Sequence, residues 1–128
     1  INDAGLVFDT ARGFGWAADI SGDNRIRSRV PEVWRDSFLF TRSHAVWEYV
    51  LPNGTYQVTV CVGDSDHIQE GQNVTVEDTV LIEGVTTSAG LFVEKTTTVE
   101  VRDGRLTMAI GIPGGTMNTC VNWIRIVK

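Results

Sequence analysis

A strict alternation of apolar and polar residues between Thr55 and Val62 constrains the fold of this chain most strongly. Every second residue from Tyr56 to Val62 is a large apolar side chain, and the residues between them are Gln, Thr and Cys. A period of two is typical of a β-strand with one buried face. No window of 11 or more residues keeps a period of about 3.6, the period of a helix. The pattern therefore predicts an all-β chain.

Other strand-like runs predict seven or eight strands, at the spacing of a β-sandwich. These runs cover residues 6–8, 45–51, 74–76, 79–82, 92–102, 106–110 and 120–127. The runs at 74–76 and 79–82 form either one interrupted strand or two short ones. The long stretch from 10 to 43 does not fit the pattern, and we expect it to be an irregular loop region with a functional role.

Two turn sequences predict hairpins. Leu51-Pro52-Asn53-Gly54 combines a proline that presets φ with an Asn-Gly pair that accepts positive φ, so it should join 45–51 to 55–62 as partner strands. Asp103-Gly104 should likewise join 92–102 to 106–110.

Length and composition predict one domain over residues 1–128. The chain is 42% hydrophobic and 21% charged, which is ordinary for a globular protein. Its net charge of −5 argues against nucleic acid as the main partner, because neutralising phosphates requires a broad basic surface. No apolar run approaches the roughly 18 residues of a membrane span, so no membrane association is expected.

The positive charge is concentrated in one segment. Residues 12–42 contain six Arg and four acidic residues, a net charge of +2, whereas the other 97 residues carry −7. The planar fork of Arg suits a carboxylate or a sulfate group. The segment either contacts an acidic ligand or pairs with its own acidic residues.

The two cysteines, Cys61 and Cys120, lie at the edges of strand-like runs. They form either one disulfide, which would add roughly 3–4 kcal/mol of stability by closing a long loop, or two buried free thiols. Alone, they lack the partners that a metal site requires.

Catalytic groupings are weak in this sequence. Gly63-Asp64-Ser65, followed by Asp66-His67, resembles the start of a hydrolase motif, but neighbours on one loop cannot converge as a Ser-His-Asp relay. Asp64 then either caps its turn beside a solvated His67, contacts a ligand together with it, or shares a metal. The carboxylates of Glu77, Asp78 and Glu83 would allow glycoside hydrolysis only in an enclosing cleft.

The four tryptophans divide into two groups. Trp47 and Trp123 lie inside strand-like runs, which favours burial. Trp16 and Trp34 lie in the long loop region near arginines, where a ring can stack on a sugar while polar groups bind its hydroxyl or acid groups. Packing of these two rings against the sandwich is the alternative.

Four segments together resemble a known family. They are Gly13-Phe14-Gly15-Trp16, the stretch from Trp47 to Val60, Val62-Gly63-Asp64, and Asn118 to Ile126. They resemble the non-catalytic carbohydrate-binding modules of the galactose-binding-like, malectin-like β-sandwich type. Such modules are attached to polysaccharide-degrading enzymes, especially bacterial pectin and rhamnogalacturonan enzymes.

This resemblance implies a jelly-roll sandwich that binds a plant or algal cell-wall polysaccharide and does not cleave it. It also implies a secreted, monomeric module that targets an attached catalytic domain. Carried onto this sequence, the ligand-binding residues are Trp16, Arg25, Arg27, Trp34, Arg35, Asp64, His67 and Asn118. The arginines favour an acidic or sulfated glycan. The alternatives are a neutral galactan, xylan or agar-type ligand, a small glycan-active hydrolase or lyase, and a structural or protein-binding sandwich.

Related family 35 modules often hold a structural calcium near the chain ends. This sequence lacks their acidic opening, and Asn122 stands where Asp is common in that family. We therefore expect no resident cofactor or metal, with calcium as the alternative.

Overall fold

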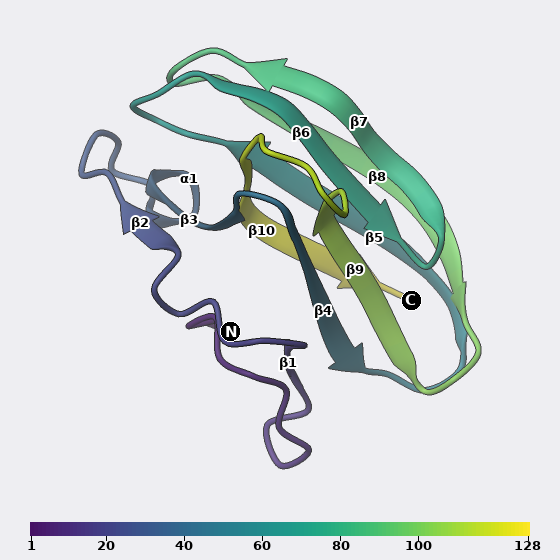
Figure 1. Ribbon diagram of the computed structural model, residues 1–128. Helices are drawn as coiled ribbons and strands as arrows, with labels where there is room; N and C mark the ends of the chain where they lie inside the picture. Colours follow the sequence, from purple (N-terminus) through teal and green to yellow (C-terminus); the bar gives the residue numbers. More distant parts are fainter.

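The computed structural model describes residues 1–128 and consists of two antiparallel five-stranded sheets packed face to face (Figure 1). The first sheet has the order β1 (Phe14–Trp16), β4 (His44–Val50), β9 (Arg105–Gly111), β6 (Gln69–Val76) and β7 (Thr79–Thr87). The second has the order β2 (Asn24–Ile26), β3 (Ser37–Thr41), β10 (Thr119–Val127), β5 (Gly54–Gly63) and β8 (Phe92–Val101). The predicted all-β sandwich is confirmed.

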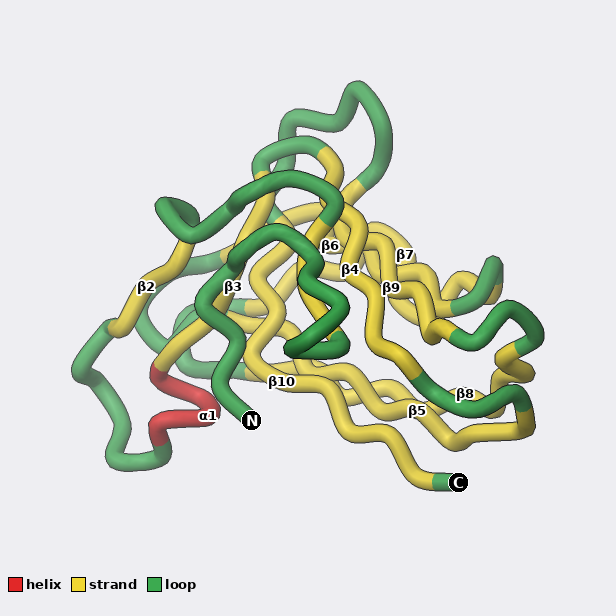
Figure 2. Tube along the Cα trace, turned by 90° about the horizontal axis from the view of Figure 1, so that it is seen from below, coloured by secondary structure: helices red, strands yellow, loops and turns green.

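Helical structure is limited to α1 (Val33–Asp36), a single turn beside the second sheet (Figure 2). The structure contains no helix with the length and apolarity that a membrane crossing requires.

Strands β3 to β10 have jelly-roll connectivity. Four of them form β4-β9-β6-β7 in one sheet, and the other four form β3-β10-β5-β8 in the other. Most connections therefore cross from one sheet to the other, as in two interlocked Greek keys.

This connectivity shows that both predicted hairpins were wrong. β4 pairs with β1 and β9, whereas β5 pairs with β8 and β10, so the chain changes sheets between Val50 and Gly54. It changes sheets again between β8 and β9. The two connections are bonded to each other: Asn53 Nδ2 donates to the carbonyl of Arg102 at 2.9 Å, and the amide of Gly104 donates to Asn53 Oδ1 at 2.8 Å. The turn residues mark a reversal of the chain without specifying which sheet it enters.

The core lies between the sheets and confirms the alternation of β5. The four apolar side chains predicted to share one face of β5, at 56, 58, 60 and 62, are all buried in the main hydrophobic cluster. On the facing sheet, Leu106, Met108 and Ile110 of β9 alternate into the same core. Burial of a large aliphatic side chain stabilises the fold by about 1.5–3 kcal/mol.

Residues 10–43 are more regular than expected, because they contain β1, β2, α1 and β3. The sequence of β3 shows no alternation of apolar and polar residues, because both faces of this strand are covered. Leu39 lies in the main core, while Phe38 and Phe40 lie in a separate cluster on the outer face. The expected strand at 6–8 is only an isolated bridge from Val7 to Trp16.

Residues 69–87 form two strands rather than one interrupted strand. The turn between β6 and β7 is made by Glu77 and Asp78, both with positive φ (46° and 63°). Two consecutive residues of this kind form the tight turn that suits the twist of a hairpin.

Candidate functional site

The outer face of the second sheet carries an apolar floor. Phe38 and Phe40 project there from β3, since Leu39 between them turns into the core. Cys120 lies directly opposite Phe40 in the neighbouring strand β10. The three buried side chains form a small hydrophobic cluster separate from the main core.

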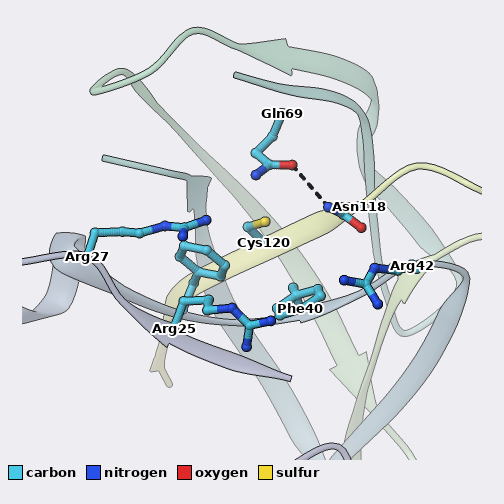
Figure 3. Close-up of a pocket in the computed structure, with 8 residues that line it drawn as sticks. Arg25, Arg27, Phe40, Arg42, Gln69, Asn118 and Cys120 are labelled. Atoms are coloured by element: carbon cyan, nitrogen blue, oxygen red, sulfur yellow. Dashed lines mark hydrogen bonds between the residues drawn. The ribbon is translucent and has the colours of Figure 1, made fainter. Parts of the chain in front are cut away.

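Three arginines surround this floor (Figure 3). The guanidinium carbons of Arg25 and Arg42 lie 4.9 Å and 5.5 Å from the centre of the Phe40 ring, and that of Arg27 lies 5.2 Å from the centre of the Phe38 ring. The space between them is a hollow of about 90 Å³. We call it the basic pocket, lined by Arg25, Arg27, Phe38, Phe40, Arg42, Gln69, Asn118 and Cys120.

The basic pocket holds positive charge that no carboxylate neutralises. Arg25 Nη1 donates to the backbone carbonyls of Asn24 (2.7 Å) and Gly22 (3.4 Å), and neither Arg25 nor Arg42 forms an ion pair. Both guanidinium groups nevertheless lie against one phenyl ring. Like charges held together beside a surface of low polarity create a positive potential that favours an anion.

Arg27 is the paired member of the group. Its Nε and Nη2 donate to the two carboxylate oxygens of Asp64 at 3.0 and 2.7 Å, the bidentate geometry that Arg favours. The hydrogen bond to Asp64 raises the pKa of Arg27. Arg27 is thereby fixed at the wall of the basic pocket.

Asp64 is an internal anchor and not a surface contact. It follows β5 directly, its exposed fraction is 0%, and it accepts further hydrogen bonds from the amides of Asp66 and His67 and from Gln69 Nε2. Burial alone would raise the pKa of Asp64, but the hydrogen bonds from Arg27, the Asp66 amide and Gln69 outweigh it, so the pKa is lowered. Asp64 holds Arg27 and Gln69 in position, and the structure does not support the prediction that it contacts a ligand directly.

A second buried carboxylate orders the segment after Arg27. Asp36 accepts hydrogen bonds from the backbone amides of Ser28 (2.7 Å), Arg29 (2.7 Å) and Val30 (3.2 Å). These bonds, that from Arg29 above all, lower the pKa of Asp36. The irregular loop between β2 and α1 thus has a defined shape.

Trp34 and Arg35 lie beside a second hollow on the same sheet face. This hollow, of about 420 Å³, is lined by Arg35, Gly90, Leu91, Phe92 and Glu94, and we call it the Arg35 hollow. The guanidinium carbon of Arg35 lies 4.6 Å from the centre of the Trp34 ring and 5.6 Å from that of Phe92. Trp34 is 47% exposed.

Trp16 is where the prediction and the structure differ most. It is 2% exposed and lies in the main core, because Gly13-Phe14-Gly15-Trp16 ends as strand β1, paired with β4 opposite Trp47. Its Nε1 donates to the carboxylate of Asp3 at 3.2 Å, and Trp47 Nε1 donates to the same group at 2.7 Å. The predicted stacking of Trp16 on a sugar is wrong. Trp47 is buried as predicted, whereas Trp123 is only partly buried.

His67 is exposed on the loop that follows β5. Its Nδ1 is 3.6 Å from Asp66 Oδ2 and 4.0 Å from Asp64 Oδ2. Ser65 Oγ donates a long 3.4 Å hydrogen bond to Asp36, and no hydrogen bond joins Ser65 to His67. The loop therefore shows a capped turn with an exposed imidazole. No group of three or more His, Cys, Asp or Glu side chains is placed to hold a metal ion.

The carboxylates weighed for glycoside hydrolysis serve the scaffold or lie on its surface. Glu77 Oε1 accepts the amide of Thr107 at 2.7 Å, and partial burial raises the pKa of Glu77. Asp78 occupies the exposed turn after β6, and Glu83 is exposed on β7.

Cys61 and Cys120 are both free and buried, so the disulfide alternative is wrong. A bulge at Asn122 places Trp123 opposite Cys61, whereas Cys120 lies opposite Phe40 on the other neighbouring strand. A disulfide requires Cα atoms within about 7 Å, and two cysteines offset by three residues on paired strands do not meet. The Cys61 thiol instead donates to Asn122 Oδ1 at 3.6 Å.

We predict that neither thiol reacts with a water-soluble thiol reagent in the folded protein. Burial raises the pKa of each to about 12, and the thiolate is the reactive form. Titration with the reagent at neutral pH should detect no thiol in buffer and both thiols in denaturant. Detection of none in denaturant without reductant would show that a disulfide forms.

Sequence reasoning missed Phe38, Phe40, Arg42 and Gln69 as pocket residues, and it considered Cys120 only for a disulfide. Arg42 belongs to the basic segment, but its position at the end of β3 depends on recognising that strand. Gln69 begins β6, next to Asn118, whose Nδ2 donates to Gln69 Oε1 at 3.4 Å (Figure 3). The structure brings together Arg25, Arg27 and Asn118 from the predicted set. Arg35 lines the other hollow, and Trp34 packs against Arg35 beside it.

Comparison with known proteins gives one similarity in sequence and several in structure. No protein-family model matches the chain. Residues over a 121-residue alignment are 30% identical to β-agarase A of Zobellia galactanivorans, covering 91% of this chain and 22% of the relative. The chain thus spans about a fifth of the length of that curated relative.

Two solved structures illustrate the structural similarity. Protein YxiM of Bacillus subtilis aligns with a TM-score of 0.65 and 20% identity, over 98% of this chain and 34% of that one. This chain shares its β-sandwich fold. A family 35 carbohydrate-binding module of Paenibacillus barcinonensis aligns less well, with a TM-score of 0.49 and 15% identity over 91% of this chain and 93% of the module. None of these three proteins is named as a pectin- or rhamnogalacturonan-degrading enzyme, so that part of the expected resemblance stays a prediction.

Proposed function

We propose that this chain is a non-catalytic carbohydrate-binding module that binds an acidic cell-wall polysaccharide through the basic pocket. The observation that carries the proposal is the placement of Arg25 and Arg42, without carboxylate partners, against the ring of Phe40. The sequence similarity to part of a β-agarase supports a polysaccharide as the ligand.

The size of the basic pocket supports binding of an acid group. A volume of about 90 Å³ is well below the roughly 300 Å³ of the smallest pockets that enclose a whole drug-sized ligand. One sulfate or carboxylate fits such a volume, while the sugar ring that carries it lies over the rim. The guanidinium groups of Arg25 and Arg42 then bind the anion, and the amide of Asn118 is placed for a neighbouring hydroxyl group.

The proposed role is targeting. The chain corresponds to about a fifth of the β-agarase that it resembles, so we propose that it works attached to a catalytic domain in a secreted enzyme. Weak binding suffices there, because a tethered domain experiences a high effective concentration of the bound polysaccharide. Among acidic polysaccharides, the relative's name favours an algal galactan that carries sulfate or carboxylate groups.

The second candidate is a module for neutral agar-type chains. The name of the relative favours it, whereas the unpaired arginines favour an acidic ligand. In that case the arginines would donate hydrogen bonds to hydroxyl groups only.

Affinity electrophoresis of the purified chain tests the proposal. The gels contain sulfated algal galactan, polygalacturonate, neutral agarose or xylan, and a protein that does not bind glycans corrects for gel effects. We expect the strongest retardation in the sulfated galactan, and weaker retardation at high salt because ions screen the contacts. Equal retardation in the neutral and acidic gels would support the second candidate. No retardation in any gel would contradict carbohydrate binding.

A further inference from the structure

We infer that the Arg35 hollow is a second subsite for the same polysaccharide, so that the module holds an interior stretch of the chain at two points. This inference rests on the proposed function and deepens it, because the basic pocket alone does not distinguish an end of the glycan from its interior. Three features of the structure carry it: the surface of the hollow, the fixed and partly exposed guanidinium group of Arg35, and the position of the hollow next to the basic pocket.

The surface of the hollow combines apolar and polar groups as a sugar ring requires. Leu91, 63% exposed, lines the hollow, and Trp34, 47% exposed, lies at its edge against Arg35. Both offer apolar surface to the C–H face of a pyranose. Arg35 and Glu94 supply polar groups for its hydroxyls, and they are only loosely paired, with 3.7 Å between Arg35 Nη2 and Glu94 Oε1. At about 420 Å³ the hollow is large enough for one sugar unit, in contrast to the smaller basic pocket.

The guanidinium group of Arg35 is held in place without being fully covered. Its central carbon lies 4.6 Å from the centre of the Trp34 ring and 5.6 Å from that of Phe92, while the Arg35 side chain stays 41% exposed. The ring of Trp34 packs in turn against the ring of Trp123, with 6.4 Å between ring centres. The rings therefore fix the exposed part of Arg35 where it can donate to a hydroxyl or acid group of the glycan.

The hollow and the basic pocket are adjacent because both are built on Asp64. The carboxylate of Asp64 binds Arg27, which lines the pocket. Its backbone carbonyl accepts the amide of Gly90, which lines the hollow, at 2.9 Å. The two sites therefore lie on either side of one loop, residues 64–67.

The span between the sites suits a polymer. The basic pocket lies over β3 and the Arg35 hollow reaches β8, three strand spacings away in the second sheet. Three spacings correspond to about 14 Å. A glycan that crosses this distance passes over the loop at 64–67, where His67 is exposed and Asp66 is paired with Arg29 at 2.9 Å. A polysaccharide held at both sites is therefore bound through an interior segment, and further sugar units can extend past either site.

The test compares a long and a short ligand by isothermal titration calorimetry. A sulfated galactan octasaccharide can reach both sites at once, whereas a sulfated disaccharide is too short to do so, and its sulfate group directs it to the basic pocket. For Trp34→Ala we expect about tenfold weaker binding of the octasaccharide, the effect of losing one aromatic contact, and unchanged binding of the disaccharide. Arg42→Ala should weaken binding of both. The matched control is Val33→Ala, an exposed apolar residue next to Trp34 in α1 that lines neither site.

The outcomes separate this inference from the proposed function. If Trp34→Ala leaves octasaccharide binding unchanged, or weakens both ligands equally, the second subsite is wrong while the basic pocket stands. If the octasaccharide binds no more tightly than the disaccharide to the unsubstituted chain, binding at two points is also wrong. If neither ligand binds that chain, the proposed function itself fails. Urea unfolding of Trp34→Ala should show a stability close to that of the original chain, since the ring is half exposed.

Discussion

Replacing Asp64 with Ala should lower the free energy of unfolding by about 3–5 kcal/mol, the usual effect of removing one member of a buried ion pair. Asp64 is fully buried and accepts hydrogen bonds from Arg27, from Gln69 and from two amides of its own loop. Its loss leaves these donors without partners and a guanidinium group partly shielded from water. Urea unfolding followed by tryptophan fluorescence measures the change.

The matched control for this substitution is Asp66→Ala. Asp66 lies two residues away on the same loop and forms an exposed ion pair with Arg29. Exposed pairs contribute about 0–1 kcal/mol, so this variant should be nearly as stable as the original chain. If the two variants lose the same stability, Asp64 is not the anchor that its contacts indicate.

Replacing both Arg25 and Arg42 with Ala should weaken binding to the acidic polysaccharide by about a hundredfold. A hydrogen bond to a charged group contributes about 1.5–3 kcal/mol, and 1.4 kcal/mol corresponds to a factor of ten. Two such contacts therefore account for at least this loss. The fold should persist, because neither arginine forms an ion pair and both lie on the outer face of the sheet. Calorimetric titration with the sulfated octasaccharide measures the affinity.

A control with the same change in charge separates the effect of losing contacts in the basic pocket from the effect of changing the net charge of the protein. Arg102 and Lys128 lie near Gly54, at the opposite end of β5 from Asp64. Replacing both with Ala also removes two positive charges, and we expect less than a threefold change in affinity after screening by salt. Similar losses in the two double variants would mean that binding depends on overall charge and not on the basic pocket.

The strands that could be predicted are those with one buried face and one face exposed to solvent. The run from Thr55 to Val62 is such a case, and β8, β9 and β10 also fall close to their predicted ranges. The sheet to which each strand belongs could not be predicted. At Asn53 the turn chemistry is local, whereas the crossing between sheets depends on contacts with residues 102–104, about 50 positions away.

The candidate site was harder to predict because burial on the outer face is invisible in the sequence. Trp16 was predicted to lie in a loop. It is instead in the core, because its strand pairs with β4 and its Nε1 donates to the carboxylate of Asp3. Phe38 and Phe40 flank a core residue, so the strand that presents them shows no polar alternation. The accumulation of arginines did indicate the charge of the site, but only the structure distinguishes Arg27, which is paired, from Arg25 and Arg42, which are not.

Titration of the isotopically labelled chain with the sulfated octasaccharide, followed by amide and side-chain NMR shifts, tests the central claim most directly. We predict that the largest shifts occur at Arg25, Arg42 and the side-chain amides of Gln69 and Asn118. Smaller shifts should follow around Trp34 and Leu91. Shifts confined to the first sheet or to the turns at the opposite end, or none at saturating ligand, would contradict the claim that the outer face of the second sheet binds the polysaccharide.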